Sequence, residues 1–188
     1  MKFLALVAWL ALLAGCASLS EEECLAGDWG GIGQRDGAAG LVAETQFARH
    51  VKACADTGVN PARAAWQAGY ARGLQSYCTP LGGLEEGLDG RGYRNVCPAA
   101  SEAAFLRGFQ IGQDDYKARE DVRRVQSKIA SLRARNAEIV GLITAEDSGL
   151  QADLQNNQAE LLRLQLELGF VRAQAARTRR AVAEFRAG

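Results

Sequence analysis

Five cysteines, a single histidine and two aspartates are the side chains of this 188-residue chain whose types and spacing could do chemistry. Thiols form disulfides, bind metals or carry modifications, whereas a histidine with carboxylates can supply acid–base catalysis. Which chemistry applies depends on the compartment and on the elements that position the residues. The chemically capable side chains are Cys16, Cys24, Cys54, Cys78, Cys97, His50, Asp28 and Asp36.

Catalysis is the weaker interpretation of His50 and the aspartates. A Ser-His-Asp or Cys-His mechanism needs a nucleophile within hydrogen-bond reach of the base, and the sequence has no Gly-x-Ser-x-Gly motif. Asp28 and Asp36 could form the carboxylate pair of a cell-wall hydrolase, but they suit helix caps and turns equally well. A metal site of His50, Cys54 and another thiol has no recognised ligand spacing. We expect a structural His50, no metal and no cofactor; an envelope enzyme or small-ligand binder using Asp28, Asp36 and His50 is the alternative.

The first 15 residues predict export. Lys2 precedes an apolar run from Phe3 to Leu13, and Ala14 and Gly15 follow it. This is the charged, apolar and small-residue layout of a secretory signal peptide. The run is too short for a transmembrane helix, which needs about 20 apolar residues. We expect residues 1–15 to be removed.

Leu13-Ala14-Gly15-Cys16 resembles the lipobox of bacterial lipoproteins. The resemblance implies that the mature chain begins at Cys16, that this thiol carries lipid, and that residues 16–20 form a lipidated N-terminus and short linker. The membrane is then a partner through the N-terminal lipid. Ala17 and Ser18 follow, without the aspartate that retains lipoproteins in the inner membrane, which favours the periplasmic face of the outer membrane. An ordinary signal peptide beside a chance cysteine is the alternative.

The other four cysteines predict two disulfides, because an even number of thiols outside the cytoplasm usually oxidises in pairs. Three pairings are possible. Cys24 with Cys54 and Cys78 with Cys97 are favoured, since each closes a local loop of moderate length and would contribute about 3 kcal/mol.

Helix signals place these cysteines in a small all-α domain over residues 21–116. Ser20 followed by Glu23 has the form of a capping box. A second helix is predicted over residues 41–57, with Gly58 as its left-handed stop. Its expected buried face consists of Leu41, Phe47, Val51 and Cys54.

Two further helices are predicted on either side of a glycine-rich loop that follows Pro80. Asn60 as cap and Pro61 in the first turn start the third helix, which should end near Tyr77. The fourth begins near residues 98–101. Glycines recur four apart behind an aromatic, so the third and fourth helices resemble copies of one unit, with close helix contact offsetting the glycine cost of about 1 kcal/mol each. The series are Trp29 with Gly33 and Gly37, Trp66 with Gly69 and Gly73, and Phe105 with Gly108 and Gly112.

Short motifs in this domain resemble one family. They are Glu23 to Trp29, Ile32-Gly33, Asp36-Gly37, His50 with Cys54, Gly58 to Pro61, Gly73-Leu74, Tyr77-Cys78, and Tyr93 with Val96-Cys97-Pro98. They are similar to an uncharacterised family of proteobacterial lipoproteins, domain of unknown function 2799, over roughly residues 20–116. Trp66 departs from the pattern, where a smaller aromatic is expected. The resemblance implies no known reaction.

Residues 117–188 predict a coiled-coil arm, because apolar residues occupy heptad a and d positions in two runs. The polar stretch 144–149 suits a turn between antiparallel helices. Folding there pairs apolar with apolar and sets Asn136 opposite Asn157, so we expect these two to hydrogen-bond and fix the register. One continuous helix in a parallel oligomer is the alternative. The runs are Val122, Val125, Ile129, Leu132, Ile139 and Ile143, then Leu154, Leu161, Leu164, Leu168, Val171, Val182 and Phe185.

The distribution of charged residues argues against nucleic-acid binding. Residues 17–116 carry 8 Lys and Arg against 13 Asp and Glu, and residues 117–188 carry 13 against 9, which is no strongly basic surface. The sequence therefore predicts an all-α protein, a disulfide-stapled helical domain with Gly-rich loops followed by an antiparallel helical hairpin. We expect a structural or interaction role in the envelope, with the arm contacting an envelope protein or the cell wall.

Overall fold

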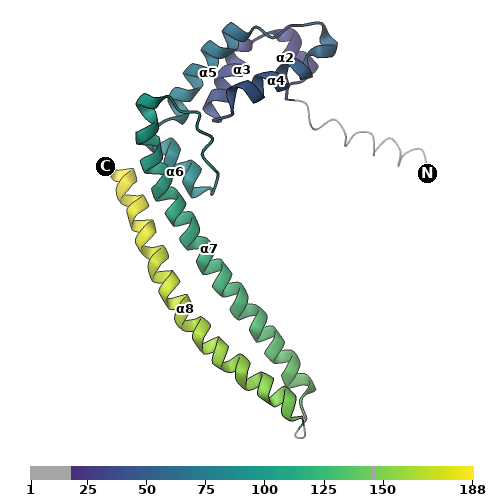
Figure 1. Ribbon diagram of the computed structural model, residues 1–188, viewed down its shortest axis with the longest axis vertical. Coiled ribbons are helices and arrows are strands. Elements are labelled where there is room, and N and C mark those ends of the chain that lie inside the picture. The colour runs from purple at the N-terminus through teal and green to yellow at the C-terminus, as the bar shows by residue number, and fades with distance from the viewer. Residues whose placement is uncertain (1–17, 145–146) are drawn as a thin grey trace, which may run out of the picture. The chain divides into compact units, whose positions relative to one another are not determined.

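The computed structural model describes residues 18–144 and 147–188, and every regular element in them is a helix (Figure 1). The all-α prediction is confirmed. The predicted signal peptide and Cys16 lie outside the described residues. The helices are α2 (Glu21–Ala26), α3 (Trp29–Ala38), α4 (Ala43–Ala53), the 3-10 turn η2 (Ala55–Thr57), α5 (Arg63–Tyr77), α6 (Pro80–Leu88), α7 (Ala99–Leu142) and α8 (Ser148–Ala187).

The chain forms two compact units. Among the described residues, the first comprises residues 18–82 and 93–104, and the second comprises residues 83–92, 105–144 and 147–188. The boundary expected between residues 116 and 117 therefore falls inside α7, which continues without a break. Among the described residues, no helix combines the length and apolar character needed to cross a membrane.

Short-range capping starts the first two helices of unit 1. The Glu23 amide donates to Ser20 Oγ at 3.2 Å and the Ser20 amide donates to Glu23 Oε2 at 3.0 Å, which is the expected capping box of α2. Asp28 caps α3, since its Oδ1 accepts from the Gly31 amide at 2.9 Å. These local bonds fix where α2 and α3 begin.

The buried face of α4 differs from the predicted one. The chain is α-helical only from Ala43 to Ala53, and η2 then leads to Gly58, whose φ of 72° is left-handed as expected. Val51 is 46% exposed, whereas Gln46, Phe47 and His50 are buried. Apolar patterning misses this face because two of its three buried side chains, Gln46 and His50, are polar. His50 is hydrogen-bonded inside the domain.

Helix α5 begins at Arg63 rather than at Asn60 and Pro61. Its N-cap is Ala62, with extended backbone and no side-chain cap. Asn60 and Pro61 therefore precede the helix, and the predicted start is wrong by two residues.

Glycines bring α3 and α5 into backbone contact. A Cβ added at Gly33 or Gly37 would overlap the carbonyl oxygens of Trp66 or Tyr70. The reverse holds for Gly69, which lies against the carbonyl oxygen of Gly30. The predicted close helix contact is therefore the crossing of α3 with α5.

The glycine-rich segment expected to be a loop is helix α6. Gly83 and Gly87 lie against the carbonyl oxygens of Phe105 and Phe109 on α7, with no room for a Cβ. Helix propensity argues against glycine, but this close packing offsets the cost. The α6–α7 crossing repeats the α3–α5 crossing, so each unit contains one copy.

At both crossings a tyrosine ring packs against a glycine with left-handed backbone. Gly40, with φ 59°, lies against the Tyr77 ring in unit 1, and Gly90, with φ 69°, lies against the Tyr116 ring in unit 2. A side chain at either glycine would collide with the ring and would strain the left-handed backbone. The repeat predicted for two helices therefore extends to their partner helices α3 and α6.

Helices α7 and α8 form the predicted antiparallel hairpin (Figure 1). Asp147 caps α8, its Oδ1 accepting from the Leu150 amide at 3.1 Å; residues 145–146 of the predicted turn lie outside the described residues. The alternative of one continuous helix is wrong. The core contains Val125, Ile129 and Leu164, with Leu132, Leu161, Leu168 and Val171 packed around them.

The predicted hydrogen bond between Asn136 and Asn157 is not formed. Within the described residues, Asn136 Oδ1 and Asn157 Nδ2 are both buried without a hydrogen-bond partner. A hydrogen bond needs these atoms within about 3.2 Å and well aligned, and heptad position alone does not direct the two amides at one another. Burial of such atoms is destabilising, so the leucine and valine layers carry the register.

Candidate functional site

A buried polar network surrounds His50 in unit 1. The His50 ring is 1% exposed and the Asp36 residue 7%. His50 Nε2 lies 2.8 Å from Asp36 Oδ2, and the Trp66 indole N–H donates to the same oxygen at 2.8 Å. On the other side of the ring, Ser18 Oγ lies 3.0 Å from His50 Nδ1. Four side chains distant in sequence therefore form one chain of hydrogen bonds.

The partners determine how His50 holds its protons. An ionised carboxylate only accepts, so Nε2 carries a proton and donates it to Asp36. In the neutral ring Nδ1 then accepts, and the Ser18 hydroxyl donates to it. His50 thus connects the N-terminal segment to the interior of the domain.

Three helices position the network. The α3–α5 crossing places Asp36 beside Trp66, and α4 brings His50 to them. Trp66 stacks on Tyr70 with ring centroids 5.1 Å apart, and Phe47 lies 5.2 Å from Trp66. The packing around Trp66 thereby fixes the direction of its indole N–H.

Tyr70 links the network to the turn after α3. Its hydroxyl donates to the Leu41 carbonyl at 2.6 Å. Burial raises the pKa of Tyr70, and the negative charge of Asp36 raises it further. The phenol is therefore held in its neutral, donating form.

The two disulfides staple the same unit. Cys24 is bonded to Cys54, with Cα atoms 5.6 Å apart, and Cys78 to Cys97, with Cα atoms 5.5 Å apart. These are the pairings favoured from loop length. Cys54, four residues after His50, is thus unavailable to the metal site considered with that histidine.

The second helix crossing lacks this network. Phe105 stands where Trp66 stands in the first, because its carbonyl oxygen lies against Gly83 as that of Trp66 lies against Gly33. Glu86 replaces Asp36 and pairs with Arg91 at 2.8 Å, and residues 91–98 contain no helix equivalent to α4. The crossing therefore folds without the polar network, which belongs to the unit that Ser18 enters.

The carboxylate pair proposed from sequence is not assembled. Asp28 caps the start of α3 and Asp36 lies eight residues later, about 12 Å along the helix axis. Glycosidase carboxylates lie roughly 5–9.5 Å apart. Asp36 instead pairs with His50 and Trp66. Tryptophan at position 66, where the family resemblance led us to expect a smaller aromatic, has a physical reason, because its indole N–H donates a hydrogen bond to Asp36.

The sequence does not indicate that Ser18 is a partner of His50 or that Trp66 is a partner of Asp36. Ser18 lies 32 residues before His50, and Trp66 lies 30 residues after Asp36. No local spacing links them, and only the fold brings them together.

A second buried carboxylate joins the helices of unit 2. Arg119 Nε donates to Asp115 Oδ2 at 2.8 Å, and the Thr178 hydroxyl donates to Asp115 Oδ1 at 3.0 Å. Arg119 also donates to the Leu88 carbonyl at 2.5 Å. This cluster ties α6, α7 and the C-terminal part of α8 together.

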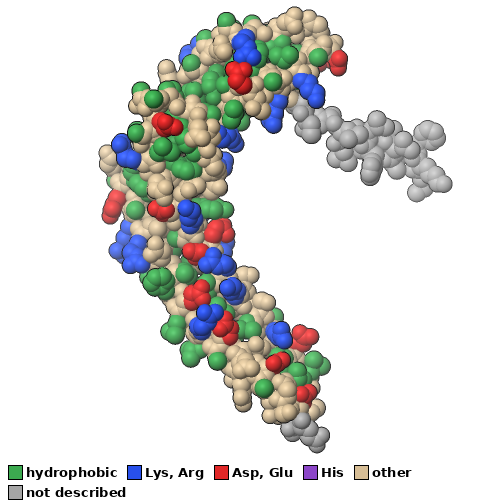
Figure 2. Space-filling model, in the orientation of Figure 1, with side chains coloured by type: hydrophobic (Ala, Val, Ile, Leu, Met, Phe, Trp, Pro, Cys, Tyr) green, Lys and Arg blue, Asp and Glu red, His purple; other side chains and the backbone are tan. Residues whose placement is uncertain are grey.

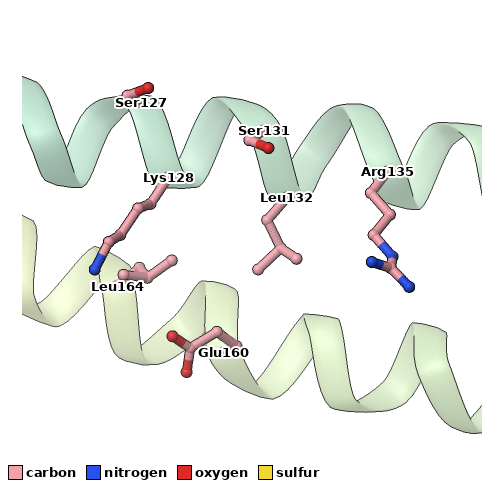
Figure 3. A pocket seen from close by; sticks show the side chains of 7 residues that line it. All are labelled: Ser127, Lys128, Ser131, Leu132, Arg135, Glu160 and Leu164. Carbon is pink, nitrogen blue, oxygen red and sulfur yellow. The ribbon is translucent and has the colours of Figure 1, made fainter.

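An open groove follows the hairpin (Figure 3). Lys128, Leu132 and Arg135 extend from α7 towards α8, while Glu160 and Leu164 line the other side. The hydrogen bond from Arg163 lowers the pKa of Glu160, with Lys128 adding to the effect. Lys128 and Arg135 of α7 and Glu160 of α8 place opposite charges on the two sides of the groove. Among the residues that line it, no nucleophile is hydrogen-bonded to a base.

A family model matches part of the chain. Residues 28–114 match a family model described as "Protein of unknown function (DUF2799)". The matched segment contains α3, α4, α5, α6 and the first part of α7, and therefore both helix crossings. No curated protein and no solved structure matches the chain.

Proposed function

Residues 28–114 form a domain of the DUF2799 family, and from this premise we propose that the chain is a lipid-anchored protein on the periplasmic face of the outer membrane. Its role is structural or interactive. The lipid at Cys16 attaches it to the membrane, and the helical hairpin presents a surface to an envelope protein or to the cell wall.

One observation carries this proposal. The chain is fastened into the domain immediately after Cys16, since Ser18 is hydrogen-bonded to His50 and Leu19 is only 6% exposed. The two residue steps from Cys16 to Ser18 span at most about 8 Å. A lipid on Cys16 would hold the His50 side of unit 1 at the membrane without a long linker, as a positioning role requires.

The hairpin supports the interaction part of the proposal. Helix α8 has 40 residues and is therefore about 60 Å long. Hydrophobic side chains reach the surface of the hairpin between charged ones (Figure 2). A long, largely solvent-exposed helix pair buries little of its own surface and offers much of it to partners.

The anchor is tested by Cys16→Ser in the producing cells. We expect acyl labelling to disappear and the protein to move from the membrane fraction to the soluble periplasmic fraction, because one residue carries all the hydrophobic anchoring. Ser18→Ala is the control, since it keeps Cys16 and removes only the bond to His50; it should remain acylated and membrane-bound. Membrane retention of an unlabelled Cys16→Ser protein would contradict the anchor.

The second candidate is an envelope enzyme. The hydrogen bonds that join Ser18 to His50 and His50 to Asp36 favour an enzyme. Serine hydrolases connect a serine, a histidine and an aspartate in the same way. Against it, His50 is almost fully enclosed and Asp36 also binds Trp66. A fluorophosphonate probe separates the candidates: labelling of the parent chain that Ser18→Ala abolishes supports the enzyme, and absence of labelling supports positioning.

A further inference from the structure

Three large apolar side chains lie exposed in a row on α8. Leu162, Leu166 and Phe170 are 62%, 71% and 69% exposed. Residues four apart share a helix face, so the three form one stripe over two turns. Leu164, in the hairpin core, lies about 200° around the helix from Leu166. The stripe therefore faces away from α7, and contiguous exposed apolar side chains of this kind mark interaction sites.

The stripe lies in the middle of α8, away from the turn. Exposed positions of α7 such as Ala134 and Glu138 carry no large apolar side chain. The large exposed apolar residues of α7 in the hairpin are Val140 (59%) and Leu142 (65%), which lie at its C-terminal end beside the turn. Neither hairpin folding nor the heptad repeat requires leucine or phenylalanine at the three stripe positions. The three stripe residues, spaced four apart on one face in the middle of α8, therefore indicate a contact made by that helix.

Gly169 lies between two stripe residues and leaves the helix surface open there. A Cβ added at Gly169 would meet nothing within 4 Å, whereas Gly33, Gly69 and Gly83 each lie against the backbone of a neighbouring helix. A mid-helix glycine costs about 1 kcal/mol relative to alanine. The open position beside the stripe leaves room for the backbone of another helix to approach closely.

The hairpin charges select the partner and its direction. The distal part, residues 130–165, carries three Lys and Arg against five Asp and Glu, whereas the proximal segments 117–129 and 166–188 together carry ten against four. A second copy packed parallel would place the two basic parts side by side. An antiparallel copy places the basic part of each hairpin beside the acidic part of the other.

We propose that α8 binds a second copy of this chain in antiparallel orientation through the stripe Leu162, Leu166 and Phe170. Leu166 lies at the two-fold axis against Leu166 of the other copy, and Leu162 packs on Phe170 of the other copy. The same patch meets itself, as a two-fold interface requires. The dimer needs only α8 and stands or falls independently of the lipid anchor.

Cysteine crosslinking of the full chain, in its own membrane and again after purification in detergent, tests the arrangement. With the parent chain as baseline, Leu166→Cys should give a disulfide-linked dimer on mild oxidation. Leu162→Cys and Phe170→Cys should link poorly alone and well when the two variants are co-expressed, because antiparallel packing joins 162 to 170. Ala134→Cys, exposed on the outward face of α7, is the matched control and should stay monomeric.

The outcomes separate the alternatives. If Leu162→Cys or Phe170→Cys links to itself as well as Leu166→Cys does, the copies are parallel and the proposal is wrong. If none of the stripe variants links above the Ala134→Cys control, or if Leu166→Cys links only to another protein, the stripe is not a self-interface. As a readout without cysteine, Leu166→Glu should halve the mass measured by sedimentation while its helical circular dichroism stays unchanged; an unchanged mass overturns the proposal.

Discussion

The residues around His50 show how a buried polar group can hold two parts of a chain together. Asp36 receives hydrogen bonds from His50 and Trp66, and the opposite ring nitrogen of His50 meets Ser18. Buried polar atoms are stabilising only when their partners are present. The network therefore favours the one arrangement in which the N-terminal segment lies against α4.

His50→Ala should lower the free energy of unfolding by about 3–5 kcal/mol, because it leaves the buried Asp36 carboxylate with an incomplete set of partners. Glu44→Ala is the control: Glu44 pairs with Arg63 at 3.1 Å on the surface, and such exposed pairs contribute roughly 0–1 kcal/mol. Denaturant unfolding of the oxidised proteins measures both. Equal losses for the two variants would show that the network contributes no more than a surface pair.

At this scale the sequence predicted the cysteine pairs but not the network. Loop length alone favours Cys24 with Cys54 and Cys78 with Cys97, because covalent closure depends on separation along the chain. Hydrogen bonds to His50 depend on how α3, α4 and α5 pack. Helical periodicity ranks apolar positions, so it placed Val51 inside where His50 is buried instead.

The helix crossings show why element prediction failed in one segment. Glycines in α6 indicate a loop when judged by helix propensity, which measures an isolated helix. In the structure the same glycines let α6 approach the α7 backbone, and the tertiary contact decides the outcome. The glycine spacing predicted close contact correctly; the sequence did not show that the segment after Pro80 supplies the second partner helix.

Alanine substitutions should separate the two kinds of glycine by the sign of their effect. Gly33→Ala and Gly83→Ala should each destabilise by roughly 1–3 kcal/mol or more, because the added methyl overlaps the backbone of the facing helix. Gly141→Ala is the matched control in α7, where an added Cβ meets nothing within 4 Å; it should stabilise by up to about 1 kcal/mol. Urea unfolding followed by circular dichroism gives the three values, and destabilisation by Gly141→Ala equal to that by Gly33→Ala would contradict the crossing geometry.

The hairpin was predictable because heptad spacing repeats over many turns. Its leucine and valine layers follow from that spacing, and the polar residues around Asp147 mark the turn. The asparagine pair did not follow, since a repeat assigns a position to each amide but not the direction of its oxygen and nitrogen. Asn136 and Asn157 therefore occupy the core without satisfying one another.

At the scale of the whole molecule, the two units are stabilised by different interactions. Both disulfides lie in unit 1, which is built from short helices. Unit 2 contains the apolar hairpin core around Val125 and Leu164 and the Asp115 cluster, with no cysteine in its residue ranges. Short helices bury little surface, so unit 1 depends more strongly on covalent closure.

Reduction of the full chain should therefore loosen unit 1 first. Opening the loops of 30 and 19 residues removes about 3–4 kcal/mol each in the chain-entropy model. Hydrogen exchange with and without reductant provides the measurement, with amides of α4 and α5 expected to lose protection and amides near Val125 and Leu164 expected to keep it. The hairpin amides serve as the internal control, because their packing involves no disulfide. Simultaneous loss of protection in both sets would mean that the two units unfold as one cooperative body and that the staples of unit 1 also stabilise the arm.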